Sequence, residues 1–201
     1  MRNIKHLYQH FTEEDREFVD KSLEKMQRVE DSYSFEVTSF VNPHQVEILR
    51  NLGNHLQLQI FSSSDYYTSE LAKVIIAPLY YELQVSDFEI DLLEISYANK
   101  FHHLTHSQIM GTVLNQLGIE RKVFGDILVA SGRVQIMVDR KFTQFFIDHI
   151  SRIAKTSVKL KQVDFSQLIA VQADSKLRDV LVSSMRLDKV LAASFRLSRS
   201  V

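Results

Sequence analysis

The 201-residue sequence contains no cysteine and no tryptophan, and it has only five glycines and two prolines. Without cysteine, the chain can form neither disulfides nor thiolate metal sites, which suits a reducing compartment. Because glycine and proline are scarce and 45% of the residues are hydrophobic, a mainly disordered chain is excluded. A chain of this length can bury a substantial core in one or two domains.

Targeting and membrane signals are also missing. The opening stretch MRNIKHLYQHFTEEDREF has no long apolar region, so it is not a secretory signal. The most apolar later run, LAKVIIAPLYY, includes Lys73 and Pro78 and is too short to span a bilayer. We expect a soluble cytoplasmic protein that makes no membrane contact.

Enzyme signatures are absent as well. The sequence has no GxxxxGK[ST] or GxGxxG loop and no HExxH or GxSxG motif. His102, His103 and His106 do not have the spacing of a metal-ligand set, and no carboxylate pair lies near them. We therefore expect no catalytic residue, no metal and no cofactor.

The net charge of −1 hides an uneven distribution. Residues 1–85 contain 8 Lys and Arg against 13 Asp and Glu, whereas the chain from Arg121 onward contains 15 against 7. An acidic front and a basic back indicate an anionic partner for the second half. The alternative is that these cations only solvate the surface, as each would when taken alone.

Apolar periodicity predicts an N-terminal α/β domain over residues 1–85. Its expected elements are a helix over 12–29, a strand over 34–41, a helix over 43–52, a strand over 56–62 and an edge strand over 73–81. Asn42 is the expected N-cap of the second helix, with Pro43 at its first position, and Gly53-Asn54 is expected to end it. The edge position of the last strand follows from Pro78.

A second domain is expected over residues 86–165. Its elements are a strand over 88–97, a helix over 105–117, a hairpin over 123–138, a helix over 141–154 and a strand over 157–163. Thr105 should cap the first helix and Gly118 should end it. The order β-α-β-β-α-β predicts a ferredoxin-like domain, an architecture that RNA-recognition modules share. The whole chain is thus α+β, and residues 166–183 are expected to be a connector.

The end of the chain, over residues 184–201, reads SMRLDKVLAASFRLSRSV. Leu187, Val190 and Leu191 share one face of a helix, and Arg186, Lys189 and Arg196 lie mostly off that face. Ser198 could cap a second helix and place Arg199 at its start, where phosphate binds well. The alternative is an amphipathic terminal helix with solvated arginines.

A family resemblance favours the interpretation that residues 184–201 bind phosphate. The stretch RLDKVLAASFRLSRS resembles the opening of the S-four type (alpha-L) RNA-binding domain, with Arg186-Leu187-Asp188 and Ser198-Arg199-Ser200 as the matching residues. That domain occurs in a small-subunit ribosomal protein, in pseudouridine synthases and in a tyrosyl-tRNA synthetase. Because the sequence stops before the second helix and the β-hairpin, residues 184–201 are expected to be the truncated start of this domain.

The middle of the chain resembles the YlmH family of bacterial S-four RNA-binding proteins. The stretch THSQIMGTVLNQLGIERKVFGDILV carries the likeness through Thr105-His106, Gly111, Leu117-Gly118, Arg121 and Gly125-Asp126-Ile127, and the front YQHFTEEDREFVDK also resembles the family's opening. The resemblance implies an RNA-binding factor that associates with the large ribosomal subunit. It also implies a role in rescuing subunits blocked by peptidyl-tRNA, in ribosome-associated quality control, and a link to cell division.

The predicted RNA-binding residues all belong to the basic half of the chain. They are Arg186, Lys189, Arg196, Ser198, Arg199, Arg121 and Lys122. Arg133, Arg140, Lys141, Lys155, Lys159 and Lys161 could extend this basic surface, whereas Asp126 is expected to accept backbone N–H bonds. The expected partners are rRNA and tRNA on the large subunit, and the expected state is a monomer. The alternative function is a division-linked protein–protein module that uses the acidic N-terminal domain.

Overall fold

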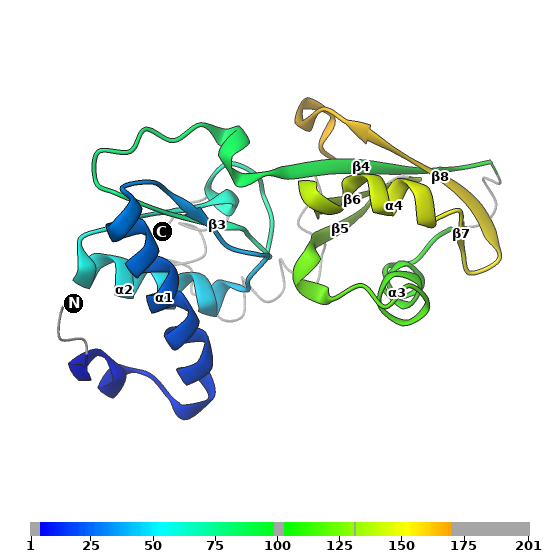
Figure 1. The fold of residues 1–201 in the computed structure, drawn as a ribbon. Helices are drawn as coiled ribbons and strands as arrows, with labels where there is room; N and C mark the ends of the chain where they lie inside the picture. Colours follow the sequence, from blue (N-terminus) through cyan, green and yellow to red (C-terminus); the bar gives the residue numbers. More distant parts are fainter. Residues whose placement is uncertain (1–4, 99–102, 131, 170–201) are drawn as a thin grey trace, which may run out of the picture. The chain divides into compact units, whose positions relative to one another are not determined.

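A computed structural model describes residues 5–98, 103–130 and 132–169 (Figure 1). Helices and strands alternate along the chain, and the expected α+β class is confirmed. Met1–Leu168 form one compact unit that contains two separate antiparallel sheets. The connector beyond residue 169 and the expected S-four start at 184–201 lie outside the described residues.

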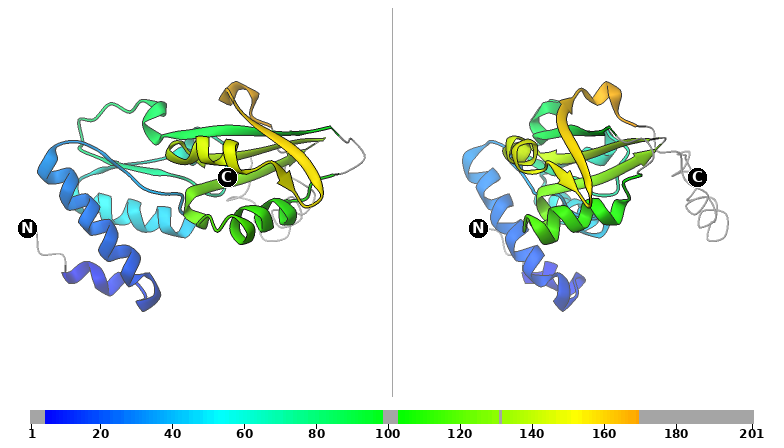
Figure 2. Two further views of the ribbon diagram at one scale, coloured as in Figure 1. Left: turned by 45° about the vertical axis from the view of Figure 1, so that its right-hand side comes forward. Right: turned by 90° about the vertical axis from the view of Figure 1, so that its right-hand side faces the viewer.

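The first sheet lies in the acidic front of the chain. The elements there are η1 (Lys5–His10), η2 (Glu13–Asp15), α1 (Arg16–Ser32), β1 (Glu36–Val37), α2 (Pro43–Leu56), β2 (Gln59–Ser62), η3 (Ser63–Asp65) and β3 (Val74–Ala77). The strand order is β1-β3-β2, and both pairs are antiparallel. Helices α1 and α2 pack on one face of this sheet, where Met26, Leu49 and Ile76 are completely or almost completely buried (Figure 2).

Helix α2 begins where the sequence predicts. The Asn42 side chain accepts a hydrogen bond from the Gln45 N–H, the Gln45 side chain accepts one from the Asn42 N–H, and Pro43 occupies the first turn. The predicted end at Gly53 is wrong, because the helix continues to Leu56 and Gln57 closes it with a φ of 58°. Gly53 instead allows β2 to approach: a Cβ there would lie 2.4 Å from the Ile60 side chain.

Two strand predictions in this part need correction. The expected strand over 34–41 pairs regularly only at β1, because Phe40 donates its N–H to the Lys122 carbonyl and only an isolated bridge joins Val41 to Ala72. The expected edge strand over 73–81 is the central strand β3. Pro78 does not interrupt it, because the strand ends at Ala77, one residue earlier.

The second sheet is built from the basic half. Its elements are η4 (Val85–Phe88), β4 (Ile90–Tyr97), α3 (His106–Met110), the π-helical η5 (Gly111–Gln116), η6 (Arg121–Val123), β5 (Phe124–Ala130), β6 (Arg133–Asp139), η7 (Arg140–Phe142), α4 (Thr143–His149), β7 (Arg152–Ile153), β8 (Thr156–Val163) and η8 (Phe165–Gln167). The strand order is β5-β6-β4-β8-β7, and every neighbouring pair is antiparallel.

Helices α3 and α4 cover one face of this five-stranded sheet, and the side chains between them form a single core that includes Leu93, Ile136 and Phe146. Thr105 caps α3 by accepting from the Gln108 N–H, as predicted, and Gly118 turns the chain after η5 with a φ of 66°. The described residues include no helix long and apolar enough to cross a membrane.

The predicted helix over 141–154 ends early. Helix α4 stops at His149, because Ile150 is extended and Arg152–Ile153 pair with the start of β8. The side chain of Ile153 is fully buried in the core, so this short strand is held in place by apolar burial.

A buried ion pair joins the two sheets. Lys73, just before β3, is 2% exposed, and its Nζ lies 3.4 Å from Asp139 Oδ2 at the end of β6. The same Nζ donates to the Glu89 carbonyl at 3.2 Å. Burial lowers the pKa of Lys73, and the Asp139 carboxylate opposes that shift. The charged amine therefore depends mainly on the Asp139 carboxylate for its compensation, with a smaller contribution from the charge of Glu89.

Substituting Asp139→Asn should destabilise the protein by about 3 kcal/mol at neutral pH, because a buried ammonium group loses its counter-charge. In the unsubstituted protein, Asp139 Oδ1 accepts a hydrogen bond from the Lys141 N–H at 3.0 Å. The side-chain oxygen of asparagine can still accept this hydrogen bond. A lowered lysine pKa means that the unfolded state binds more protons than the folded state, so the deficit should shrink as the pH rises toward about 10. Urea unfolding at several pH values measures it.

The matched control is Asp148→Asn on the exposed surface of α4, where the carboxylate accepts from Gln144 Nε2 at 2.8 Å. This change should stay within about 0.5 kcal/mol of the unsubstituted protein. Equal losses for the two variants would contradict the role given to the Lys73–Asp139 pair.

Candidate nucleic-acid interface

Strand β8 presents its cations on the sheet face opposite α3 and α4. Val158 and Leu160 point into the helix-covered core, whereas Lys159 and Lys161, which alternate with them, are exposed. The strand is paired with β4, and the partner of Lys161 in that register is Glu94. The alternation of the sequence therefore places both ammonium groups on one surface.

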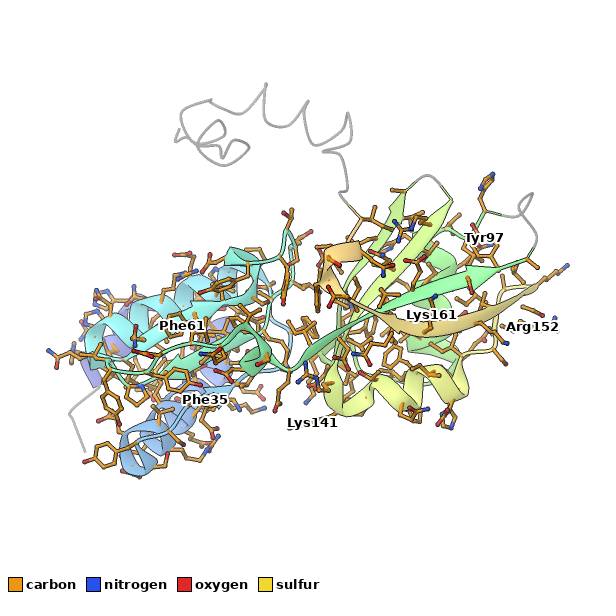
Figure 3. All side chains as sticks on the ribbon, turned by 90° about the horizontal axis from the view of Figure 1, so that it is seen from above. Phe35, Phe61, Tyr97, Lys141, Arg152 and Lys161 are labelled. Carbon is orange, nitrogen blue, oxygen red and sulfur yellow. The ribbon has the colours of Figure 1, made fainter. Side chains whose placement is uncertain are left out.

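Two further cations lie where β7 turns into β8. Arg152 and Lys155 are exposed, and together with Lys159 and Lys161 they are called the β8 cation row. Within the described part of the chain, none of these four side chains makes an ion pair. The sequence contains no carboxylate between His149 and Val163. Figure 3 labels Lys161 on β8 and Arg152 near the far end of the strand pair.

The rest of the sheet face opposite α3 and α4 is neutralised internally. Arg133 donates to Glu94 Oε1 at 2.6 Å, and Gln135 Nε2 donates to the same oxygen at 2.8 Å. The hydrogen bond from Arg133 lowers the pKa of Glu94. Gln135 also donates to the Gln167 carbonyl, which brings the end of the described chain against this face. Leu92, Gln135 and Met137 on this face are buried, so its cations in the described chain are exposed mainly along β8, at Lys159 and Lys161. The charge of Lys161 also helps to lower the pKa of Glu94, which lies opposite it.

The strands themselves contribute no aromatic platform to this face. The aromatic residues of β4, β5, β6 and β8 are Tyr97 and Phe124, and both pack in the helix-covered core. Phe88, before β4, is fully buried against Tyr66. The surface can therefore bind an anionic backbone by charge, but it cannot stack bases as aromatic-bearing sheets do.

A hollow at the ends of β4 and β8 adjoins the β8 cation row. It encloses about 510 Å³ and is lined by Ser96, Tyr97, Ala98, Ser157, Val158 and Lys159. Its lining is mostly apolar, and the Ser96 hydroxyl donates to the Lys159 carbonyl at 3.3 Å, so the hollow is an apolar recess beside the lysines.

The two predicted loop cations have different surroundings. Arg121 Nη1 donates to the carbonyls of Phe124 and Gly125 at 2.6 and 3.3 Å, and its guanidinium carbon lies 4.2 Å from the centroid of the Phe124 ring. Burial lowers the pKa of Arg121. Its charge thus stabilises the loop. Lys122 is exposed and lies 3.4 Å from Glu120, also exposed, an arrangement that costs little to break.

The Gly125-Asp126 motif joins the two sheets. The Asp126 carboxylate accepts hydrogen bonds from the backbone N–H groups of Glu70 and Leu71 at 2.7 and 2.9 Å, as the sequence predicts. Gly125 leaves room for Phe40, because a Cβ there would lie 2.6 Å from the phenyl ring. The motif is a structural junction.

The remaining predicted RNA-binding residues lie in the tail. Arg186, Lys189, Arg196, Ser198 and Arg199 are outside the described residues, and their roles stay predictions. The described residues contain no cluster of three or more His, Asp or Glu that could hold a metal ion.

Comparison with known proteins gives the family. Residues 14–81 match the family model described as "YlmH, N-terminal", and residues 84–167 match the one described as "Putative RNA-binding domain in YlmH". Over 193 residues, the chain is 32% identical to "Ribosome-associated protein quality control protein P2" of Bacillus subtilis (strain 168), an alignment that covers 96% of this chain and 75% of the relative. The chain belongs to the YlmH family.

A solved structure supports the same assignment. The protein named "Cell division protein ylmH from Streptococcus pneumoniae" is 48% identical to the chain, with a TM-score of 0.71. The likeness covers 81% of this chain and 98% of that one. The β8 cation row lies inside the segment that matches the RNA-binding domain of the YlmH family.

Sequence reasoning grouped six cations that the structure separates. Arg133 and Arg140 are bound to Glu94 and Asp91, whereas Lys159 and Lys161 are free of ion pairs within the described chain. The period-two alternation of SVKLKQV already separated the two lysines from the core residues. The junction lysine, Lys73, was missed, although a lone cation inside the apolar run LAKVIIAP was a usable signal.

Substituting Gly125→Ala should destabilise the protein by about 1–3 kcal/mol, because the new methyl group would collide with the buried Phe40 ring. Denaturant unfolding measures the change. The control is Gly111→Ala, where no atom lies within 4 Å of the added Cβ and the backbone is helical. That change should stabilise by up to about 1 kcal/mol, and a reversed order would contradict the packing described.

Proposed function

We propose that the chain is a non-catalytic, cytoplasmic RNA-binding protein that associates with the large ribosomal subunit. It contacts rRNA and peptidyl-tRNA as a monomer, in translation rescue and ribosome-associated quality control. The observation that carries the proposal is the β8 cation row, four exposed cations without a carboxylate among them, inside the segment that matches an RNA-binding domain. The name of the Bacillus subtilis relative supports the setting on the ribosome.

The proposed mechanism is recognition of the RNA backbone. Lysine and arginine side chains displace the counterions of phosphates, and this release supplies affinity without reading sequence. The strands carry no exposed aromatic platform, so base stacking contributes little on this face.

The domain assignments belong to the same proposal. Residues 1–85 form the N-terminal α/β domain, and residues 86–165 form a ferredoxin-like domain. The strand order β5-β6-β4-β8 and the helices on one face support the second assignment. Residues 166–183 connect to the start of an S-four type domain, whose Arg186, Lys189, Arg196, Ser198 and Arg199 provide a second RNA contact. Lys122 extends the RNA contact made by the β8 cation row.

Substituting Lys159→Ala and Lys161→Ala together should weaken binding to purified large subunits and to tRNA by about tenfold near 0.1 M salt. The slope of log K against log salt should fall by about 1.5, because two phosphate contacts are lost. The double variant Lys21→Ala/Lys25→Ala on α1 removes the same charge from the acidic front and should leave both quantities unchanged. An unchanged slope for the β8 variant would refute this contact.

The tail contact has its own test. Arg186→Ala with Arg199→Ala should reduce co-sedimentation with large subunits severalfold, because two guanidinium–phosphate contacts are removed. Full co-sedimentation of this variant would remove the tail from the proposal and leave the β8 cation row as the sole site.

The second candidate function is a protein–protein contact linked to cell division. It is favoured by the name of the Streptococcus pneumoniae relative and by the acidic charge of residues 1–85. It predicts a protein partner whose binding survives nuclease treatment.

A further inference from the structure

Aromatic side chains gather on the side of the first sheet opposite α1 and α2. Ile60 and Ile76 face α1 and α2, so the cross-strand row of Val37 and Phe61 points to the opposite side. Beside this row, Tyr33, Leu79 and Tyr80 are 75%, 63% and 69% exposed, and the Phe35 and Tyr81 rings pack together with centroids 5.0 Å apart. Tyr33, Phe35, Leu79, Tyr80 and Tyr81 are called the aromatic rim. Figure 3 labels Phe35 and Phe61 on this part of the molecule.

The aromatic rim is held rigidly. Gln59 Nε2 donates to the carbonyls of Pro78, Leu79 and Tyr81 at 2.9, 2.8 and 3.1 Å, which fixes the turn that follows β3. The Tyr80 hydroxyl donates to the Tyr33 carbonyl at 3.3 Å. Burial and a hydrogen bond to Asp87 raise the pKa of Tyr81 to about 12. The exposed rings are therefore presented by an ordered backbone, which limits the entropy lost when a partner binds.

Tyr33 occupies a position that normally suits glycine. It ends α1 in the left-handed conformation, with a φ of 54°. Glycine adopts this conformation at a helix end without strain, whereas an aromatic residue does not. Tyr33 is also 75% exposed, so its ring is available for a contact outside the chain.

The two segments that form the aromatic rim carry carboxylates and no cation of their own. The sequence has no Lys or Arg over residues 29–49 or over residues 74–98, and both segments contribute to this surface. Asp31 and Glu82 are exposed there. The nearest α1 cation, Arg28, is bound to Glu36 at 3.0 Å. This potential repels RNA and attracts a cationic ligand.

We propose that the aromatic rim binds a partner protein through a segment that combines basic and apolar side chains. Arginine or lysine groups lie over the tyrosine rings and near Asp31 and Glu82, while an apolar side chain packs on Leu79. The inference rests on the second candidate function and is independent of the β8 cation row.

The test uses a labelled 12-residue peptide of alternating arginine and leucine, titrated by fluorescence anisotropy against the purified chain. Tyr33→Gly with Tyr80→Ala should weaken its binding at least tenfold. Tyr33→Gly alone should weaken binding while the unfolding midpoint stays equal or rises, because glycine relieves the backbone strain. Weaker binding together with an equal or higher unfolding midpoint distinguishes loss of the contact from loss of the fold.

Matched controls isolate charge and location. Glu82→Lys should weaken binding severalfold. Glu14→Lys makes the same charge change in η2, just before the start of α1 and roughly 25 Å along the helix from Tyr33, and should have little effect. A peptide with glutamate in place of arginine, and one with serine in place of leucine, should each bind at least tenfold more weakly.

The outcomes are decisive. The proposal is overturned if the peptide does not bind, or if the rim variants bind it as the unsubstituted chain does. It is also overturned if Tyr33→Gly/Tyr80→Ala weakens binding of tRNA, since the rim would then be an RNA surface. The Lys159→Ala/Lys161→Ala variant should retain peptide binding, so failure of RNA binding and failure of the rim are separately visible.

Discussion

The two sheets of this protein depend on a small buried junction. The Lys73 ammonium group is paired with Asp139, the Asp126 carboxylate holds two backbone N–H groups, and the Phe40 ring fits against Gly125. Each of these contacts joins a residue of the first 85 to a residue beyond 120. The junction makes one compact unit from halves of opposite charge, and the one cation it buries comes from the acidic front.

The cationic surface and the aromatic surface belong to different halves of that unit. The basic half presents lysines on a sheet face without aromatic residues, and the acidic half presents aromatic residues on a face without cations. The first surface suits an anionic polymer that is recognised by its backbone, and the second suits a cationic protein segment. A member of the YlmH family with both surfaces has the means to contact RNA and protein at the same time.

The features that could be predicted from the sequence are those that depend on neighbouring residues or on the type of one side chain. Asn42 and Thr105 were predictable as helix caps, and Asp126 as an acceptor for backbone N–H groups, because each prediction depends on a few neighbouring residues or on side-chain type. Non-local features escaped prediction. The central place of β3 depends on which strands pair, and the inward turn of Arg121 depends on the Phe124 ring and two carbonyls that only the folded loop brings together. The early end of α4 follows from pairing between β7 and β8, which periodicity within the helix does not reveal.

The position of β3 also bears on how the chain is made. In the first sheet β1 and β2 pair with β3 and not with each other, although β3 is the last of the three to be synthesised. During translation, α1, β1, α2 and β2 therefore emerge without any strand ladder to close their apolar faces. Residues 74–77 complete both ladders in one step, so the acidic front of the nascent chain acquires its native sheet only when this short segment has left the ribosome.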